Sequence, residues 1–207
     1  TSNAFVFFPE LKKKWNPDEE GLKDNPEFKP WRNKAKTGAY LLAFGGGAPK
    51  LASSLGLSKE QGKLAYDNYW KENIGLGKLK EAVEAYFDTK GKGKYIPAQD
   101  GRLVHVRGKN VLLSCLGQGL GAICMSYAAC LMDTWLGELH LDSLGRPYYL
   151  YKGHCVRRIS MVHDEYSWEV EDGVEEEVKQ LSTKAIVKAG EMLKLEIPLA
   201  AEGKMKK

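Results

Sequence analysis

The sequence predicts an α+β fold, with a helical first part followed by a long buried helix and antiparallel strands. Helical patterns cover residues 32–44, 58–70 and 76–87, and the second of these begins with a capping box. Residues 111–132 contain no charged side chain, which indicates a central helix. Residues 156–170 approach the period of two that is typical of half-buried strands.

Composition places the chain among soluble globular proteins. The 207 residues are long enough to bury a core, and 43% of them are hydrophobic and 28% charged. The net charge of +4 permits a polyanionic partner without demonstrating one. The four cysteines form no CxxC pair, which favours reduced thiols in a cytosolic protein over disulfides or zinc. No signal peptide is predicted.

Residues 1–31 are predicted to be an irregular, solvated segment. A short apolar run, Phe5–Phe8, is stopped by Pro9. Charge runs follow at Lys12–Lys14 and Asp18–Glu20. This composition favours loops over a packed element.

The helix that begins near residue 32 carries two cations followed by two aromatic residues, and it ends at the glycine run 45–47. Arg32, Lys36, Tyr40 and Phe44 recur every four residues. At about 100° per residue, neighbours in this series are rotated by only ~40°, so they share a face. Such a stripe suits a triphosphate followed by a sugar and a base. The alternative is a helix with solvated cations and core aromatics.

The charge-free stretch Val111–Met132 has the length of a membrane helix, but its polar residues and glycines favour a buried central helix. It also contains Gly117-x-Gly119-x-x-Ala122, which imitates a dinucleotide-binding fingerprint. Such a fingerprint also needs an acidic residue on a second strand about twenty residues further on. The sequence offers no clear candidate for it, because Asp133 falls in the same predicted helix. A dinucleotide binder therefore ranks third among the functional hypotheses.

His163-Asp164-Glu165 is predicted to form the tip of a tight hairpin between two strands. Carboxylates on a rigid turn are ligands that Mg²⁺ accepts, together with substrate phosphates. The alternative is an ordinary polar turn, because Asp is common in turns.

The last part of the chain is predicted to be a helix followed by a strand. Asp172 and Glu175 are candidate capping residues, and apolar residues at helical spacing follow them up to Met192. Leu195, Ile197 and Leu199 recur at every second position, which predicts a final strand.

Taken together, these motifs resemble the family A DNA polymerases, in particular their podoviral replicase branch. The resemblance covers about residues 30–204. It rests on three motifs in the family's order: Arg32-x-x-x-Lys36-x-x-x-Tyr40 (motif B), Asp100-Gly101-Arg102 through Gln118-x-x-Gly121, and Val162-His163-Asp164-Glu165 (motif C).

The resemblance implies a helical fingers lobe at residues 32–98. It also implies part of an antiparallel-sheet palm, with its central helix and metal hairpin, at residues 99–207. Asp164 would be a catalytic residue and a ligand of two Mg²⁺ ions, with Glu165 assisting. His163, Gln118 and Arg102 would contact the primer terminus or the minor groove of the DNA.

The fingers residues receive nucleotide-binding roles from the same resemblance. Arg32 and Lys36 would bind the triphosphate of the incoming nucleotide, and Lys36 would also take part in catalysis. Tyr40 would pack against the sugar, and Phe44 occupies the place of the residue that stacks on the template base pair.

The implied function is template-directed DNA synthesis with Mg²⁺, primer-template DNA and dNTPs, in the cytoplasm of a bacterial cell or phage-infected host and without a membrane partner. No counterpart of the family's motif A precedes Arg32. No thumb or 3′–5′ exonuclease region is identified either. We therefore expect the isolated chain to be inactive, and the missing parts to be carried by a further segment of a longer protein or by a second chain. The alternative is a non-catalytic fragment that binds nucleic acid or a partner.

Overall fold

The computed structural model describes residues 2–205 and divides into two compact units. The first unit contains the chain up to Pro97 together with Leu103–Leu116. The second contains Ala98–Arg102 and the chain from Gly117 onward. The predicted boundary between residues 98 and 99 lies next to the first crossing between the two units, and Leu103–Leu116 returns to the first unit. The hairpin strand after Arg102 and the start of the central helix pack with the helical unit.

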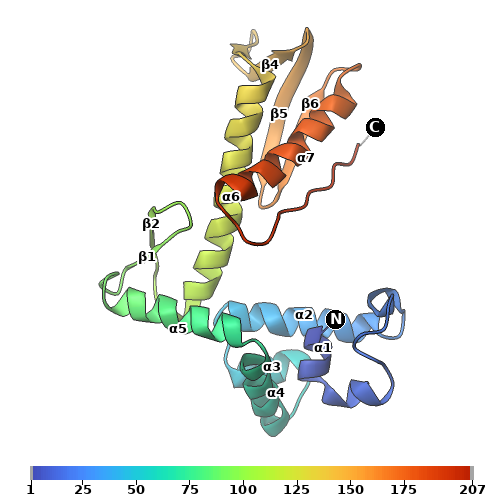
Figure 1. The fold of residues 1–207 in the computed structure, drawn as a ribbon, viewed down its shortest axis with the longest axis vertical. Helices are drawn as coiled ribbons and strands as arrows, with labels where there is room; N and C mark the ends of the chain where they lie inside the picture. The colour runs from blue at the N-terminus through green and yellow to red at the C-terminus, as the bar shows by residue number, and fades with distance from the viewer. Residues whose placement is uncertain (1, 206–207) are drawn as a thin grey trace. The chain divides into compact units, whose positions relative to one another are not determined.

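The first unit is mainly helical (Figure 1). A small antiparallel pair joins β1 to β2, with Ile96 opposite Val104. The elements are α1 (Ser2–Phe7), η1 (Pro9–Lys13), η2 (Leu22–Asp24), α2 (Lys29–Ala43), α3 (Ala48–Leu55), α4 (Lys59–Glu72), α5 (Ile74–Asp88), β1 (Tyr95–Pro97), β2 (Leu103–His105) and η3 (Lys109–Val111).

The second unit is a four-stranded antiparallel sheet with strand order β3-β4-β5-β6. The side chains of α6 and α7 pack in one cluster with those of β4, β5 and β6, so both helices cover the same face of the sheet (Figure 1). The elements are α6 (Leu112–Leu136), whose first turn belongs to the first unit, β3 (Leu139–Leu141), β4 (Pro147–Tyr151), β5 (His154–Val162), β6 (Glu165–Val170) and α7 (Glu175–Met192). The predicted α+β fold class is confirmed.

Local chemistry explains where the helices of the first unit begin and end. The predicted capping box forms at α4: Ser58 Oγ accepts from the Gln61 amide at 3.2 Å, and Gln61 Oε1 accepts from the Ser58 amide at 2.9 Å. Beyond α2 the chain turns at Gly45, whose φ is +81°. A Cβ there would lie 1.7 Å from the carbonyl oxygen of Asn110, so the close approach of the two backbones requires glycine.

The prediction that residues 1–31 are irregular and solvated is wrong. This segment forms α1, η1 and η2, and its apolar residues build the core of the first unit. Phe28 is fully buried and stacks on Phe5 with ring centroids 5.4 Å apart, while Trp15 meets the same ring edge-on at 5.6 Å. The charged residues lie outward between these anchors. The buried positions in the short 3₁₀ turns follow no sustained period, so periodicity did not reveal them.

The central helix is confirmed as α6, extending to Leu136. Among the described helices it is the one long and apolar enough to span a membrane by length and composition. Its residues Ala128, Met132 and Leu136 pack instead with the sheet and α7. The glycines of the dinucleotide-like match lie inside this helix and not in a turn after a strand, which removes the structural context that such a fingerprint needs.

Two predictions about the end of the chain are corrected. The N-cap of α7 is Val174, while Glu175 Oε2 accepts from the Gly173 amide at 2.6 Å, so Asp172 does not cap the helix. Residues 195–199 form no strand. Leu199 packs instead against Gly190 of α7, where an added Cβ would approach within 2.9 Å of its side chain.

Candidate nucleotide and metal sites

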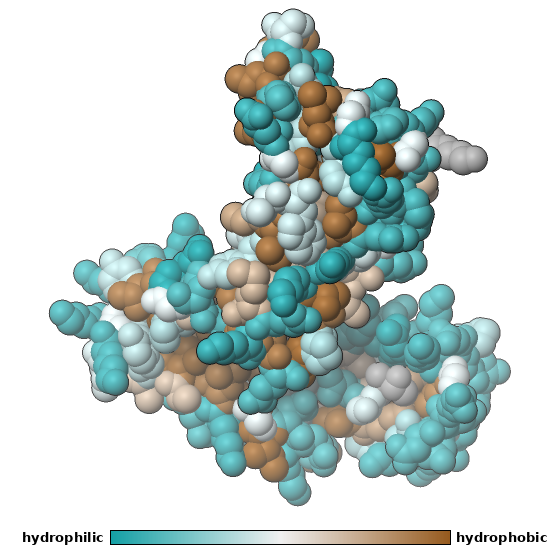
Figure 2. Space-filling model, turned by 45° about the horizontal axis from the view of Figure 1, so that its top comes forward, coloured by the Kyte–Doolittle hydropathy of each residue, from teal (hydrophilic) through white to brown (hydrophobic). Residues whose placement is uncertain are grey.

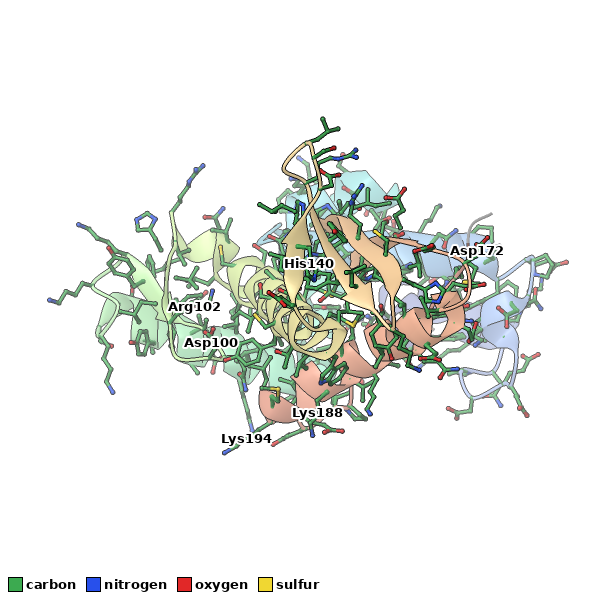
Figure 3. All side chains as sticks on the ribbon, turned by 90° about the horizontal axis from the view of Figure 1, so that it is seen from above. Asp100, Arg102, His140, Asp172, Lys188 and Lys194 are labelled. Atoms are coloured by element: carbon green, nitrogen blue, oxygen red, sulfur yellow. The ribbon has the colours of Figure 1, made fainter. Side chains whose placement is uncertain are left out.

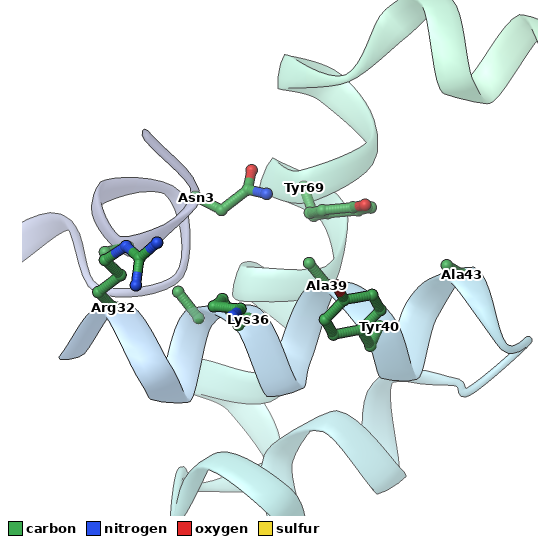
Figure 4. A pocket seen from close by; sticks show the side chains of 9 residues that line it. Asn3, Arg32, Lys36, Ala39, Tyr40, Ala43 and Tyr69 are labelled. Carbon is green, nitrogen blue, oxygen red and sulfur yellow. The ribbon is translucent and has the colours of Figure 1, made fainter. Parts of the chain in front are cut away.

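The cationic and aromatic stripe of α2 lines a hollow in the first unit (Figure 4). Arg32, Lys36 and Tyr40 contribute to one side, and the small side chains of Ala35 and Ala39 leave room between the helices. The volume is about 340 Å³, within the range of roughly 300–1,000 Å³ that is common for ligand pockets. The structure therefore brings together three of the four residues that the sequence predicts on this helix.

Phe44, the fourth residue of the stripe, is placed differently. It is the C-cap residue of α2, and 49% of its surface is exposed. It does not line the hollow. Tyr40 is also open to solvent, with 61% of its surface exposed, although its ring borders the hollow.

The other wall of the hollow comes from α1 and α4, and sequence reasoning missed it. Asn3 of α1 and Tyr69 of α4 lie across from Ala39 (Figure 4). Tyr69 is only 4% exposed and stacks on Phe7 with ring centroids 5.4 Å apart. Burial raises the pKa of its hydroxyl above the usual value.

The two cations of the hollow are free to bind an anion. Among the described residues, no carboxylate forms an ion pair with Arg32 or Lys36. Lys63 of α4, by contrast, pairs with Asp67 at 2.8 Å. Two unpaired cations one helical turn apart are suited to a polyphosphate.

The hairpin that was predicted at residues 163–165 forms, with a turn of two residues. Val162 of β5 pairs with Glu165 of β6, which leaves His163 and Asp164 at the tip. All four side chains are exposed. His163 has φ +54°, in the left-handed region that only a few per cent of non-glycine residues adopt. The tight turn holds the Asp164 carboxylate at the end of two hydrogen-bonded strands.

Polar contacts behind the sheet fix this hairpin on α6. The Tyr166 hydroxyl donates to the carbonyl of Met125. Arg158 Nη1 and the Tyr149 hydroxyl both donate to Asp133 Oδ1, at 3.1 and 2.6 Å. Burial, followed by the Asp133 carboxylate, raises the pKa of Tyr149 to about 12, so the hydroxyl stays protonated and remains a donor.

The hairpin offers fewer metal ligands than a closed site needs. Asp164 and Glu165 supply oxygen donors of the kind that Mg²⁺ prefers. Among the described residues, however, no group of three or more His, Cys, Asp or Glu side chains could hold an ion. The donors present fit Mg²⁺ chemistry, and further ligands have to come from water, substrate or another polypeptide segment.

The two remaining predicted DNA contacts lie in the second unit. Arg102 Nε donates to Asp100 Oδ2 at 2.7 Å, and the two side chains lie side by side (Figure 3). The guanidinium lowers the pKa of the Asp100 carboxyl. The Arg102 side chain remains 58% exposed, so it is oriented but accessible. Gln118 is exposed on α6.

The surface of α6 around Gln118 is unusually bare. A Cβ added at Gly117, Gly119 or Gly121 would meet no other described atom within 4 Å. Internal packing among the described residues therefore does not require these glycines, although each costs a helix about 1 kcal/mol relative to alanine. On the face drawn in Figure 2, apolar residues gather in patches between hydrophilic ones.

Comparison with known proteins supports the predicted resemblance. No family model matches the chain. The chain is 28% identical over 180 residues to the DNA-directed DNA polymerase of Escherichia phage Phieco32, which covers 84% of this chain and 26% of that protein. It is 30% identical over 105 residues to the DNA-directed DNA polymerases of Escherichia phage T7 and Enterobacteria phage T3, covering 45% of this chain and 15% of each.

A solved structure shares the fold. The POL domain of Pol1 from M. smegmatis, in complex with DNA primer-template and dNTP, superposes with a TM-score of 0.67 at 23% identity. The match covers 90% of this chain and 31% of that one. The chain spans about a quarter of the length of the Phieco32 polymerase. The predicted resemblance to DNA polymerases is confirmed.

Proposed function

We propose that this chain is the fingers-and-palm part of a template-directed DNA polymerase, which transfers nucleotides from dNTPs to a primer 3′ end. The observation that carries the proposal is the hollow on α2. In a relative of phage DNA polymerases, it presents two unpaired cations beside a tyrosine in a cavity of about 340 Å³. The enzyme would work in the cytoplasm of a bacterial cell or phage-infected host.

In this proposal the first unit binds the incoming nucleotide. Arg32 and Lys36 lie four residues apart, which is about 6 Å along the helix axis. This spacing allows each to contact a different phosphate of the triphosphate by a charge-assisted hydrogen bond. Lys36 also stabilises negative charge that develops on the leaving pyrophosphate. Tyr40 packs on the sugar, and Phe44, beyond the hollow, is exposed for stacking on a base pair.

In this proposal the second unit binds the metal ions. Asp164 would hold Mg²⁺, with Glu165 beside it. When bound, the ions polarise the phosphoryl oxygens and lower the pKa of the attacking 3′-hydroxyl. The contribution of the chain itself is to keep the carboxylates at the tip of a hairpin that Tyr166 ties to α6. His163 contacts the primer terminus.

Primer-template DNA is the proposed macromolecular partner. Arg102, held by Asp100, and Gln118 are exposed donors that suit the acceptors of the minor groove. The glycines flanking Gln118 leave a flat helix surface to which a DNA backbone can come close. Close approach of DNA would therefore account for glycines in α6 that its own packing does not require.

The two carboxylates of the hairpin lead us to propose that catalysis needs a further segment. A two-metal site clamps both the attacking and the leaving oxygen, which takes more ligands than Asp164 and Glu165 supply. A motif A strand, in a longer form of the protein or in a second chain, would provide the missing carboxylate. Thumb and exonuclease parts would come from the same source.

Primer extension tests this function. A radiolabelled primer-template, dNTPs and Mg²⁺ are incubated with the chain alone, and with a polypeptide that carries motif A. We expect no extension by the chain alone and extension by the combination. Robust incorporation by the isolated chain would contradict the proposed incompleteness. DNA binding without extension in both reactions would favour a non-catalytic nucleic-acid-binding fragment.

A further inference from the structure

The hydroxyl of Tyr69 is an unused polar group that reaches the hollow on α2. The residue is 4% exposed, and it lines the hollow opposite Ala39 (Figure 4). Among the described residues, none hydrogen-bonds its hydroxyl, although the Tyr69 carbonyl accepts from Asn73 Nδ2 at 2.8 Å. The hydroxyl oxygen is not fully buried, and its residue lines the hollow.

The ring of Tyr69 is fixed, and its hydroxyl is therefore held in place. It stacks on Phe7 at 5.4 Å with an interplanar angle of 6°, and meets Trp70 edge-on at 5.3 Å. A buried tyrosine normally satisfies its hydroxyl with a protein partner. A rigid ring whose hydroxyl has no protein partner, in the wall of a ligand-sized cavity, suits a ligand contact.

The position of the hydroxyl along α2 decides which part of the ligand it meets. Ala39, which lies opposite Tyr69, follows Lys36 by three residues and Arg32 by seven, about 4.5 and 10 Å along the helix axis. If the cations bind the phosphates, Tyr69 lies past the phosphates, at the level of Tyr40. A neutral hydroxyl both donates and accepts, which matches a sugar hydroxyl.

We propose that Tyr69 is a specificity-determining residue, whose hydroxyl forms a hydrogen bond with the 3′-hydroxyl of the incoming deoxynucleotide. The inference rests on the proposed nucleotide site and extends it to the opposite wall. Tyr40 and Tyr69 would flank the sugar from two helices. The two hydroxyls have opposite effects on discrimination between deoxy- and dideoxynucleotides. The Tyr40 hydroxyl improves the binding of a sugar without a 3′-hydroxyl, and the Tyr69 hydroxyl improves the binding of a sugar that has one.

The test is nucleotide binding by the chain itself, measured by calorimetry with dATP, 2′,3′-dideoxy-ATP and tripolyphosphate. Tyr69→Phe removes only the hydroxyl and keeps the ring stack on Phe7. We expect the dissociation constant of dATP to rise roughly two- to tenfold, which is the range of one net hydrogen bond. The constants for dideoxy-ATP and tripolyphosphate should not change.

Two control variants separate this inference from the proposed function. Tyr66→Phe removes a hydroxyl from the same helix at a residue that does not line the hollow, and it should change nothing. Lys36→Ala should weaken all three ligands. If Lys36→Ala does so and Tyr69→Phe has no effect on dATP, the proposed function stands and the role of Tyr69 is refuted.

The remaining outcomes also decide the matter. Equal weakening of dATP and dideoxy-ATP by Tyr69→Phe would overturn the contact to the 3′-hydroxyl. Failure of the wild-type chain to bind any of the three at millimolar concentration would overturn both the site and the inference. If Tyr69→Phe lowers the melting temperature, nuclear Overhauser contacts between the wild-type Tyr69 ring and the sugar protons decide instead, and their absence with bound dATP refutes the proposal.

Discussion

The hollow on α2 holds the side chains proposed to bind nucleotide, and the hairpin tip between β5 and β6 holds those proposed to bind metal. The surroundings of the two groups differ strongly. Residues of three helices line the hollow, and one of its walls contains a tyrosine that is 4% exposed. The hairpin places Asp164 and Glu165 in solvent, among no group of three metal-binding side chains in the described part of the chain.

This difference indicates what each unit does by itself. A pocket with fixed walls can bind a small ligand without help, because the cost of arranging its side chains is met during folding. A pair of exposed carboxylates holds a hydrated ion weakly, because water screens their charge and no further ligand excludes it. We therefore expect the first unit to bind nucleotide before the metal site is complete.

The largest effect should come from the carboxylate that is proposed to hold the metal. Asp164→Asn in the complete enzyme should lower primer extension roughly a thousandfold, because metal stabilisation is worth several kcal/mol and each 1.4 kcal/mol is a factor of ten. The measurement is single-nucleotide incorporation. Glu138→Gln, which changes an exposed carboxylate outside the hairpin, is the control and should keep full activity. Equal rates for both variants would mean that Asp164 does not bind the catalytic metal.

The second prediction concerns the stability of the first unit. Phe28→Ala should lower the free energy of unfolding of this unit by about 3–5 kcal/mol, because it empties a fully buried ring site between Phe5 and Trp15. Chemical denaturation followed by tryptophan fluorescence measures this loss. Phe44→Ala, at a side chain that is 49% exposed, should cost clearly less. Similar losses would mean that the N-terminal segment does not form the core.

The triphosphate contact is the next in size. Lys36→Ala in the complete enzyme should reduce kcat/KM for dNTP at least tenfold, since a hydrogen bond to a charged group is worth about 1.5–3 kcal/mol. Steady-state incorporation kinetics provide the measurement. Lys29→Ala removes an exposed cation from the same helix outside the hollow, and should have little effect. Unchanged kinetics for Lys36→Ala would mean that the cations of α2 are solvated and do not bind the triphosphate.

The smallest effect concerns discrimination at the sugar. The Tyr40 hydroxyl is expected to replace the missing 3′-hydroxyl of a dideoxynucleotide, so the enzyme should accept chain terminators readily. Tyr40→Phe should reduce kcat/KM for ddNTP by roughly two- to tenfold relative to dNTP, the range of one net hydrogen bond. The ratio of the two specificity constants is measured in wild type and variant. An unchanged ratio would mean that Tyr40 does not contact the sugar of the incoming nucleotide.

The sequence by itself determined the features that depend on neighbours along the chain. The four-residue spacing of Arg32, Lys36 and Tyr40 places them on one helix face through backbone geometry alone. The capping box at Ser58 and the hairpin turn at Asp164 are equally local. The motif order was sufficient to indicate a polymerase, because it does not depend on how distant segments pack.

Only the tertiary structure decided which distant segments complete the sites. Asn3 and Tyr69 carry no local signal of a ligand contact, and they reach the hollow only because α1 packs beside α2 and α4 packs beside α1. The aromatic residues before Phe28 were missed for the same reason: their burial follows from contacts across the unit and not from a regular period. Local geometry is set by covalent neighbours, whereas a pocket wall is set by packing between residues far apart in sequence.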